Sequence, residues 1–127
     1  MSGTIRVLVC GGREFDDYTG FANYLYRNFH PAADEMYLTP IIIHGDAKGA
    51  DFLARIWAKA NSFSQEKYPA NWKTHGKKAG PIRNQEMLDR GKPDVVVAFP
   101  GDTGTADMIS KAKKQGVPVV EVGADDL

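Results

Sequence analysis

Apolar and polar residues alternate in blocks along the chain, and these blocks predict strands and helices in turn. Short runs, most of them rich in β-branched and apolar residues, predict strands at 5–10, 40–44, 65–68, 94–99 and 117–122. Between these runs, apolar residues recur at helical spacing and predict helices at 18–29, 50–60, 81–91 and 105–112. Regular alternation of strands and helices indicates the α/β class.

This alternation predicts a parallel sheet that helices cover on both faces. The run at 94–99 is apolar on both faces, as a buried parallel strand requires. We expect one domain over residues 1–127, a three-layer Rossmann-like sandwich with a parallel five-stranded sheet in the order 3-2-1-4-5. Ligands of such sheets bind beyond the carboxyl ends of the strands, where the strand order reverses, which here lies between the first and fourth strands.

Three of the predicted strands run directly into loops that contain glycine, at 11–15, 45–51 and 100–105. Because the carboxyl ends of parallel strands share one edge of the sheet, we expect the three loops to lie together. The last of them precedes a helix, whose N-terminus presents free amides and a partial positive charge to an anion. The loops therefore predict a site for an anionic ligand.

The loop at 100–105 has the residue types of a phosphate-binding turn. After Pro100, Gly101 and Gly104 permit close backbone approach, and the hydroxyl of Thr105 can donate to an oxyanion. Asp102 opposes this interpretation, because its carboxylate repels phosphate unless it points outward or binds a ribose hydroxyl. The alternative is a tight turn from strand to helix that binds nothing.

Other side chains of these loops have a functional and a structural interpretation each. Arg13 follows two glycines and could clamp a phosphate, or pair with a neighbouring acid. Arg83, with Asn84, is placed in the first turn of a helix, where a cation is unfavourable unless an anion is recruited. Asp51 could hold a ribose or cap its helix. Trp72 could stack on a base or pack against the sheet edge.

The composition of the chain limits the classes of partner that it can bind. Its 127 residues carry 16 basic and 16 acidic side chains, so no global field favours nucleic acid or a membrane. Cys10 ends an apolar strand, and we interpret it as a core residue. Because it is the only cysteine, no internal disulfide can form, which is typical of a cytoplasmic protein. The three histidines show no metal-ligand spacing, and no signal-peptide or membrane-spanning pattern is present. We expect no metal, no cofactor, no membrane and no nucleic acid.

Several motifs together resemble the SLOG superfamily of Rossmann-like nucleotide-binding domains, which includes the LONELY GUY phosphoribohydrolases and the DNA-processing protein A domain. The motifs are GGREF at 11–15, HGDAKGAD at 44–51, AGPIRN at 79–84, PGDTGT at 100–105 and GTADM at 104–108. They are most similar to the YspA-like branch and span nearly the whole chain. The resemblance implies the fold and a nucleotide-derived ligand at the glycine loops. It also implies a homo-oligomer, because relatives commonly pair through helices beside the site.

The chain departs from the enzymes of this superfamily at the position of their catalytic glutamate. LONELY GUY enzymes carry Pro-Gly-Gly-x-Gly-Thr, then two residues and a Glu, whereas here the second Gly is Asp102 and the Glu is Met108. Methionine cannot move a proton or stabilise a developing positive charge. Arg83 still matches the arginine of these enzymes, so the resemblance supports binding of a nucleotide more than cleavage of its N-glycosidic bond.

We therefore expect a sensor or sequestering module that binds a nucleotide or an ADP-ribose-like ligand. The alternative is a phosphoribohydrolase-type enzyme that uses another carboxylate, with Glu14, Asp46, Asp51 and Asp102 as candidates. The expected ligand-binding residues come from all four motif regions: Gly11, Gly12, Arg13, Glu14, Gly45, Asp46, Asp51, Arg83, Asn84, Pro100, Gly101, Asp102, Thr103, Gly104 and Thr105.

Overall fold

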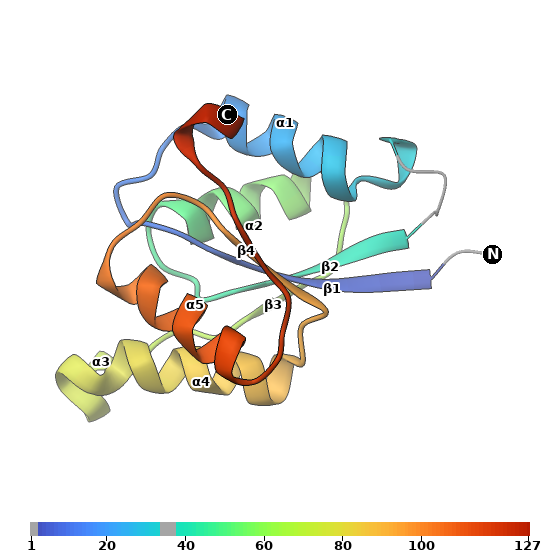
Figure 1. Ribbon diagram of the computed structural model, residues 1–127. Helices are drawn as coiled ribbons and strands as arrows, with labels where there is room; N and C mark the ends of the chain where they lie inside the picture. The colour runs from blue at the N-terminus through green and yellow to red at the C-terminus, as the bar shows by residue number, and fades with distance from the viewer. Residues whose placement is uncertain (1–2, 34–37) are drawn as a thin grey trace.

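A computed structural model describes residues 3–33 and 38–127 of the chain, and its five strands form one parallel sheet (Figure 1). The strand order is β3-β2-β1-β4-β5, and every neighbouring pair is parallel. The strands are β1 (Gly3–Cys10), β2 (Leu38–His44), β3 (Gln65–Lys67), β4 (Val95–Ala98) and β5 (Val119–Glu121). The predicted fold class and strand order are confirmed. Part of the predicted connection before β2, at 34–37, lies outside the described residues.

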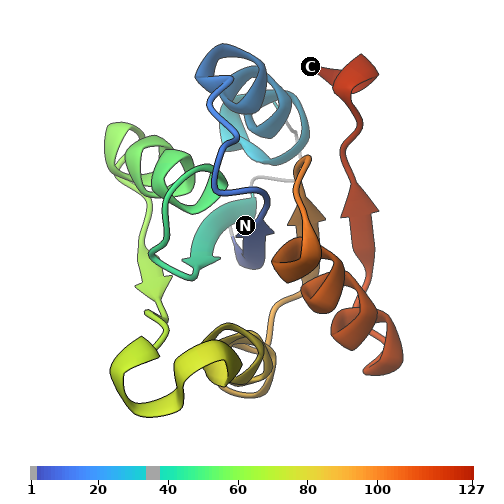
Figure 2. The ribbon, with the colours of Figure 1, turned by 90° about the vertical axis from the view of Figure 1, so that its left-hand side faces the viewer.

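The helices form two layers, one on each face of the sheet (Figure 2). One layer holds α1 (Tyr18–Phe29) and α2 (Ala50–Ala60), and the other holds α4 (Ala79–Gly91) and α5 (Thr103–Lys114). A short helix, α3 (Trp72–His75), leads into α4 through a 3₁₀ turn. Among the described residues, no helix combines the length and the apolar character that crossing a bilayer requires.

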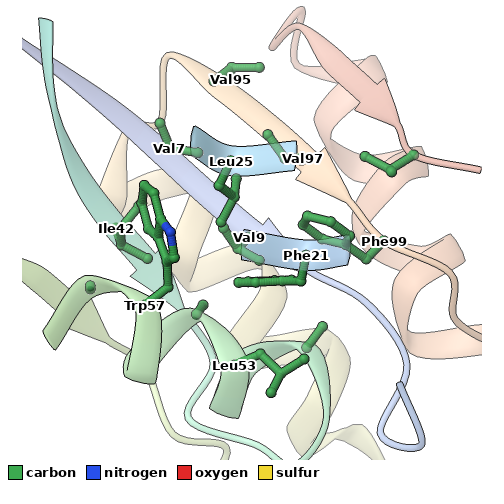
Figure 3. Close-up of a cluster of buried hydrophobic side chains, with 14 residues drawn as sticks. Val7, Val9, Phe21, Leu25, Ile42, Leu53, Trp57, Val95, Val97 and Phe99 are labelled. Carbon is green, nitrogen blue, oxygen red and sulfur yellow. The ribbon is translucent and has the colours of Figure 1, made fainter. Parts of the chain in front are cut away.

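The larger apolar core lies between the sheet and the α1–α2 layer (Figure 3). Phe21 of α1 packs on Phe99 at the end of β4, with ring centroids 4.5 Å apart. Trp57 and Leu53 of α2 also point into this core, so they are not available as an association surface. On the same helix, Ile56 remains exposed.

A second core lies between the sheet and the α4–α5 layer. It contains Leu8 and Cys10 of β1, Met87 of α4 and Met108 of α5. Met108 is 0 % exposed, so position 108 is part of the core and its side chain lies beneath α5. Burying a side chain of this size contributes ~1.5–3 kcal/mol.

The polar segment before α4 is more helical than its composition indicates. The sequence predicted a polar loop after the strand at 65–68 and a helix that begins at Pro81. In the structure, α3 and the 3₁₀ turn occupy 72–78 and α4 begins at Ala79. The side chain of Asn71 caps α3, since its Oδ1 accepts from the backbone N of Thr74 at 3.0 Å. Arg83 consequently lies in the second turn of α4, and the prediction that it lies in the first turn, beside the positive end of the helix dipole, was wrong.

Two other local predictions also change. Helix α5 begins at Thr103, because Oδ1 of Asp102 accepts from the backbone N of Gly104 at 3.3 Å and caps the helix. Thr103, Gly104 and Thr105 therefore belong to the first helical turn. Asp51 does not cap α2: the N-cap is Gly49, and Asp51 is the second residue of the helix.

Candidate functional site

A cavity of about 830 Å³, here called the rim cavity, lies at the carboxyl edge of the sheet, the edge that faces the viewer in Figure 2. The loops after β1, β2 and β4 all contribute to it, as the strand order predicted. Most of the predicted site residues line it: Gly11, Arg13, Gly45, Asp46, Asp51, Arg83, Asn84, Asp102, Thr103, Gly104 and Thr105.

The other four predicted residues do not line the rim cavity. Gly12 is buried, and its backbone N donates to the backbone oxygen of Pro100 at 2.8 Å, which joins the first and third glycine loops. Pro100 and Gly101 line a smaller neighbouring cavity of about 190 Å³. Glu14 is exposed and lines neither cavity.

The first turn of α5 presents an unused hydrogen-bonding group. Thr105 is buried, and its Oγ1 has no hydrogen-bond partner among the described residues. A Cβ on Gly101 would collide with this oxygen, so glycine at 101 is what allows the loop to pass over it. A buried hydroxyl without a partner costs about 1–3 kcal/mol, which a bound acceptor would offset.

Asn84 ties α4 to the first turn of α5. Its Nδ2 donates to the backbone oxygen of Gly104 at 3.2 Å and to Oδ2 of Asp107 at 3.0 Å. Asp107 is also paired with Lys111, 2.6 Å away. Asn84 therefore holds the first turn of α5 in position, while Lys111 balances the charge of Asp107.

Arg83 links α4 to the end of β2 beneath the cavity. Its Nη1 donates to the backbone oxygen of Gly45 at 2.7 Å, and its Nε donates to Oδ1 of Asn84 at 3.1 Å. Nη2 makes no hydrogen bond in the described part of the chain. Burial lowers the pKa of Arg83, the carboxylate of Asp51 raises it and the charge of Arg13 lowers it again. The two guanidiniums thus repel each other in the cavity that both line.

Arg13 itself is exposed. The sequence left open a salt bridge from Arg13 to Glu14 or Asp16, and neither pair occurs among the ion pairs of residues 3–33 and 38–127. The guanidinium of Arg13 is therefore available to the cavity that it lines.

Asp51 is the most buried carboxylate of the rim cavity, at 7 % exposure. Its Oδ2 accepts from the backbone N of Ala47 at 3.3 Å. Burial raises the pKa of Asp51, and the charge of Arg83 lowers it. A Cβ on Gly45 would collide with Arg83 and lie 2.8 Å from Oδ2 of Asp51, so only glycine leaves room for both side chains.

Cys10 lies at the floor of the same cavity, and it behaves as a core residue. Burial raises the pKa of its thiol to about 12, with a further increase from the charge of Asp51. The thiol is therefore neutral at ordinary pH and is a poor nucleophile, because the thiolate is the reactive form. This agrees with its expected core role.

The second glycine loop is held by a buried histidine. Nδ1 of His44 accepts from the backbone N of Asp46 at 3.0 Å, and its Nε2 lies 2.8 Å from Oε1 of Gln65. This pattern fits a neutral ring with its proton on Nε2. Asp46 adopts a left-handed backbone, with φ of 55°, which Asp tolerates better than most residues.

Some lining residues were absent from the predicted set. They include Lys48, Trp72, Lys77 and Asp107. Lys48 lies inside a predicted loop and could have been found, whereas Trp72 and Lys77 reach the cavity only because α3 folds back on α4. Among residues 3–33 and 38–127, no group of His, Cys, Asp and Glu could hold a metal ion.

Two comparisons relate the sequence of the chain to known proteins. The model of the family described as "YspA, cpYpsA-related SLOG family" matches residues 5–75. "Gene 61 protein" of Mycobacterium phage D29 is 38% identical over 128 residues, which covers 93% of this chain and 96% of the phage protein.

Two solved structures with a similar fold belong to much larger proteins. DNA processing protein A from Streptococcus pneumoniae superposes with a TM-score of 0.69 at 16% identity, over 98% of this chain and 53% of that protein. UDP-GlcNAc 2-epimerase from Neisseria meningitidis, in a structure bound to UDP-GlcNAc, gives a TM-score of 0.56 at 15% identity, over 96% of this chain and 32% of the epimerase. The chain thus spans about half of the first protein and a third of the second. At these identities the likeness shows the fold alone.

Proposed function

Because the chain belongs to the YspA, cpYpsA-related SLOG family, we propose that its rim cavity binds a nucleotide or a nucleotide-derived ligand. The family and the nucleotide-related structural neighbours together suggest a nucleotide-related function. The size of the cavity supports a ligand of this class, because small-molecule pockets of proteins measure ~300–1,000 Å³ and this one measures about 830 Å³.

The observation that carries the proposal is the unpartnered Thr105 hydroxyl in the first turn of α5. In our proposal, a phosphate binds at this turn and accepts hydrogen bonds from Thr105 and the free backbone amides. Arg13 and Arg83 line the same cavity and supply the positive charge. A phosphate group between the guanidiniums also relieves their repulsion.

We further propose that the protein senses or sequesters its ligand without cleaving it. An ADP-ribose-like molecule is an example of such a ligand. The position that carries the catalytic glutamate in LONELY GUY enzymes is Met108, a core residue. Asp107 is occupied by Asn84 and Lys111 and has little capacity left for a substrate.

The experiment is a thermal-shift screen against nucleoside monophosphates, NAD, ADP-ribose, cyclic ADP-ribose forms and cyclic dinucleotides, with calorimetry on each hit. Gly104→Asp should abolish the shift, because it places a carboxylate beside the phosphate, whereas Gly104→Ala should retain most of it. A Cβ at Gly104 has no neighbour closer than 4.0 Å, so both variants should fold. A screen without hits, or binding by Gly104→Asp equal to that of the wild type, would contradict the proposal that a phosphate binds at the first turn of α5.

The second candidate function is hydrolysis of the N-glycosidic bond of a nucleotide, and one observation favours it. Burial raises the pKa of Asp51 inside the rim cavity, which is a common property of general acids. Asp46 and Asp102 also line the cavity, but both are exposed. Chromatography after long incubation separates the functions: intact ligand supports a sensor, whereas free base and sugar phosphate, lost in Asp51→Asn, support an enzyme.

We propose a homo-oligomer that acts in the cytoplasm on a small molecule, with no nucleic-acid partner. Phe52 and Ile56 of α2 are exposed four residues apart and offer an apolar strip for a second copy. Size-exclusion chromatography with light scattering tests this, and Phe52→Ser should shift an oligomer toward the monomer. DNA retention that falls steeply with salt would contradict the absence of a nucleic-acid partner.

A further inference from the structure

Trp72 is a large aromatic side chain on the wall of the rim cavity. It is the first residue of α3, it lines the cavity, and it is 53 % exposed. Figure 1 shows α3 at the left-hand end of the α4–α5 layer, on the side where the loops after β1 and β4 lie. The other tryptophan, Trp57, is 3 % exposed in the core. Trp72 thus lies on the wall of the cavity with about half of its surface uncovered.

The indole of Trp72 rests on the beginning of α4. A Cβ built on Gly80 would lie 3.5 Å from Cη2 of Trp72, an ordinary van der Waals distance, so the edge of the ring lies beside the beginning of α4. The remainder of the ring is left uncovered, which is costly for an apolar surface of this size. A flat partner that covered the ring would gain free energy from that burial.

The rim cavity has different lining residues near Trp72 and near α5. Gly80, Pro81, Pro69 and Ala70 line it near Trp72 in the sequence and bring no charge. Near α5 the lining is polar: Thr103, Thr105 and Asn84, with the carboxylates of Asp102 and Asp107, while the guanidiniums of Arg13 and Arg83 line the cavity from the loop after β1 and from α4. A nucleotide has the same division between an aromatic base and a charged phosphate.

The two ends of the cavity are connected through α4. Gly80 lies beside the indole, and Asn84, four residues later, donates from Nδ2 to the backbone oxygen of Gly104 at the first turn of α5. Four residues of α-helix advance about 6 Å along the axis. A ligand that stacks on Trp72 and places an anion at α5 therefore needs only a short linker, such as one ribose, between its aromatic and anionic groups.

We infer that Trp72 is the stacking surface for the base of the ligand, so the site takes a nucleoside phosphate or ADP-ribose and not a simple sugar phosphate. This inference rests on the proposed function. Lys77, in the 3₁₀ turn that follows α3, also lines the cavity and adds a positive charge to it. Stacking on an aromatic side chain tolerates all four bases, so Trp72 confers selectivity for an aromatic base without choosing among the bases.

The test uses the full chain with the tightest binder among AMP, GMP, CMP, UMP and ADP-ribose, and with ribose 5-phosphate as a probe that lacks the base. We expect the nucleotide to quench the fluorescence of Trp72 and ribose 5-phosphate to leave it unchanged. Trp72→Ala should weaken nucleotide binding about 5- to 150-fold, because stacking on one base contributes ~1–3 kcal/mol. Trp72→Phe should restore most of the affinity, and binding of ribose 5-phosphate should be equal in all three proteins.

Ile82→Ala is the matched control, because Ile82 is an exposed apolar residue of α4 that does not line the cavity. Equal nucleotide affinity of Trp72→Ala and the wild type would overturn the stacking role while leaving the proposed function intact. Equal weakening of nucleotide and ribose 5-phosphate would also overturn it, because it indicates a structural role for Trp72. A wild type that binds none of the probes would overturn both proposals.

Discussion

Arg83 donates from Nη1 to the backbone oxygen of Gly45 at 2.7 Å, and this contact joins α4 to the carboxyl end of β2. The same glycine lies against Asp51, and a side chain at position 45 would displace both the guanidinium and the carboxylate. Arg83 thus has a structural role in positioning the second glycine loop, in addition to the anion contact that we propose for its Nη2.

The structural role of Arg83 predicts a loss of stability in Arg83→Ala. We expect the free energy of unfolding to fall by about 1.5–3 kcal/mol, because hydrogen bonds from a charged group contribute about that much. Urea denaturation measures it. Arg90→Ala is the control on the same helix, since Arg90 is exposed, pairs with Glu86 one turn away and lies over the Tyr68 ring with its guanidinium 5.9 Å from the centroid; its change should stay within ~1 kcal/mol. Equal effects of the two variants would argue against the contact with Gly45.

Thr105→Val should separate stability from binding. Valine has nearly the shape of threonine but removes the unpartnered buried oxygen, so the ligand-free protein should be at least as stable as the wild type. Affinity for a phosphate-bearing ligand should fall about tenfold or more, because a hydrogen bond to a charged group contributes ~1.5–3 kcal/mol. Thermal denaturation and calorimetry measure the two effects. Thr19→Val is the control, because Thr19 is an exposed residue of α1. Unchanged affinity in Thr105→Val would count against the proposed position of the phosphate.

Asp51 predicts a pH dependence of stability. Burial raises the pKa of Asp51 above its ordinary value of 3.8, so the folded protein binds this proton more tightly than the unfolded chain does. The free energy of unfolding of the wild type should therefore fall, relative to Asp51→Asn, as pH rises from about 3.8 through the pKa of the folded state. Above that pKa the difference should be constant. Urea denaturation from pH 3.5 upward measures it, in steps of about half a unit.

Asp46→Asn serves as the control for this series, because Asp46 is an exposed carboxylate of the same loop. Its stability curve should run parallel to that of the wild type. Parallel curves for Asp51→Asn as well would show that burial does not raise the pKa of Asp51, and would weaken the hydrolase alternative.

Met108→Glu should destabilise the fold and should not create an enzyme. The sequence pattern alone suggests that this change restores the catalytic glutamate of LONELY GUY enzymes, but the side chain of Met108 lies in the second core. A buried unpaired carboxyl group costs several kcal/mol, so the free energy of unfolding should fall by more than about 3 kcal/mol. Met108→Leu should cost less than ~1.5 kcal/mol. A stable Met108→Glu protein that releases base from a nucleotide would contradict this prediction.

The site was predictable to the extent that its residues follow strands directly. Gly11, Gly45 and Asp102 come after predicted strands, and the carboxyl ends of parallel strands share one edge of the sheet, so their convergence followed from the strand order. Trp72 and Lys77 belong to a segment without hydrophobic periodicity. Their side chains line the cavity because Asn71 caps a short helix, a local contact that the periodicity of the sequence does not show.

The sequence by itself determined the fold class, the strand order and the loops that meet at the rim, because periodicity and chain connectivity are written locally in the order of residues. Only the tertiary structure decided which side chains face the cavity. It placed Arg83 beside Gly45 and Asp51, buried Thr105 without a partner, and left Trp72 exposed beside Gly80. These contacts join residues from separate elements, and their geometry depends on how the helices pack on the sheet, which no local pattern specifies.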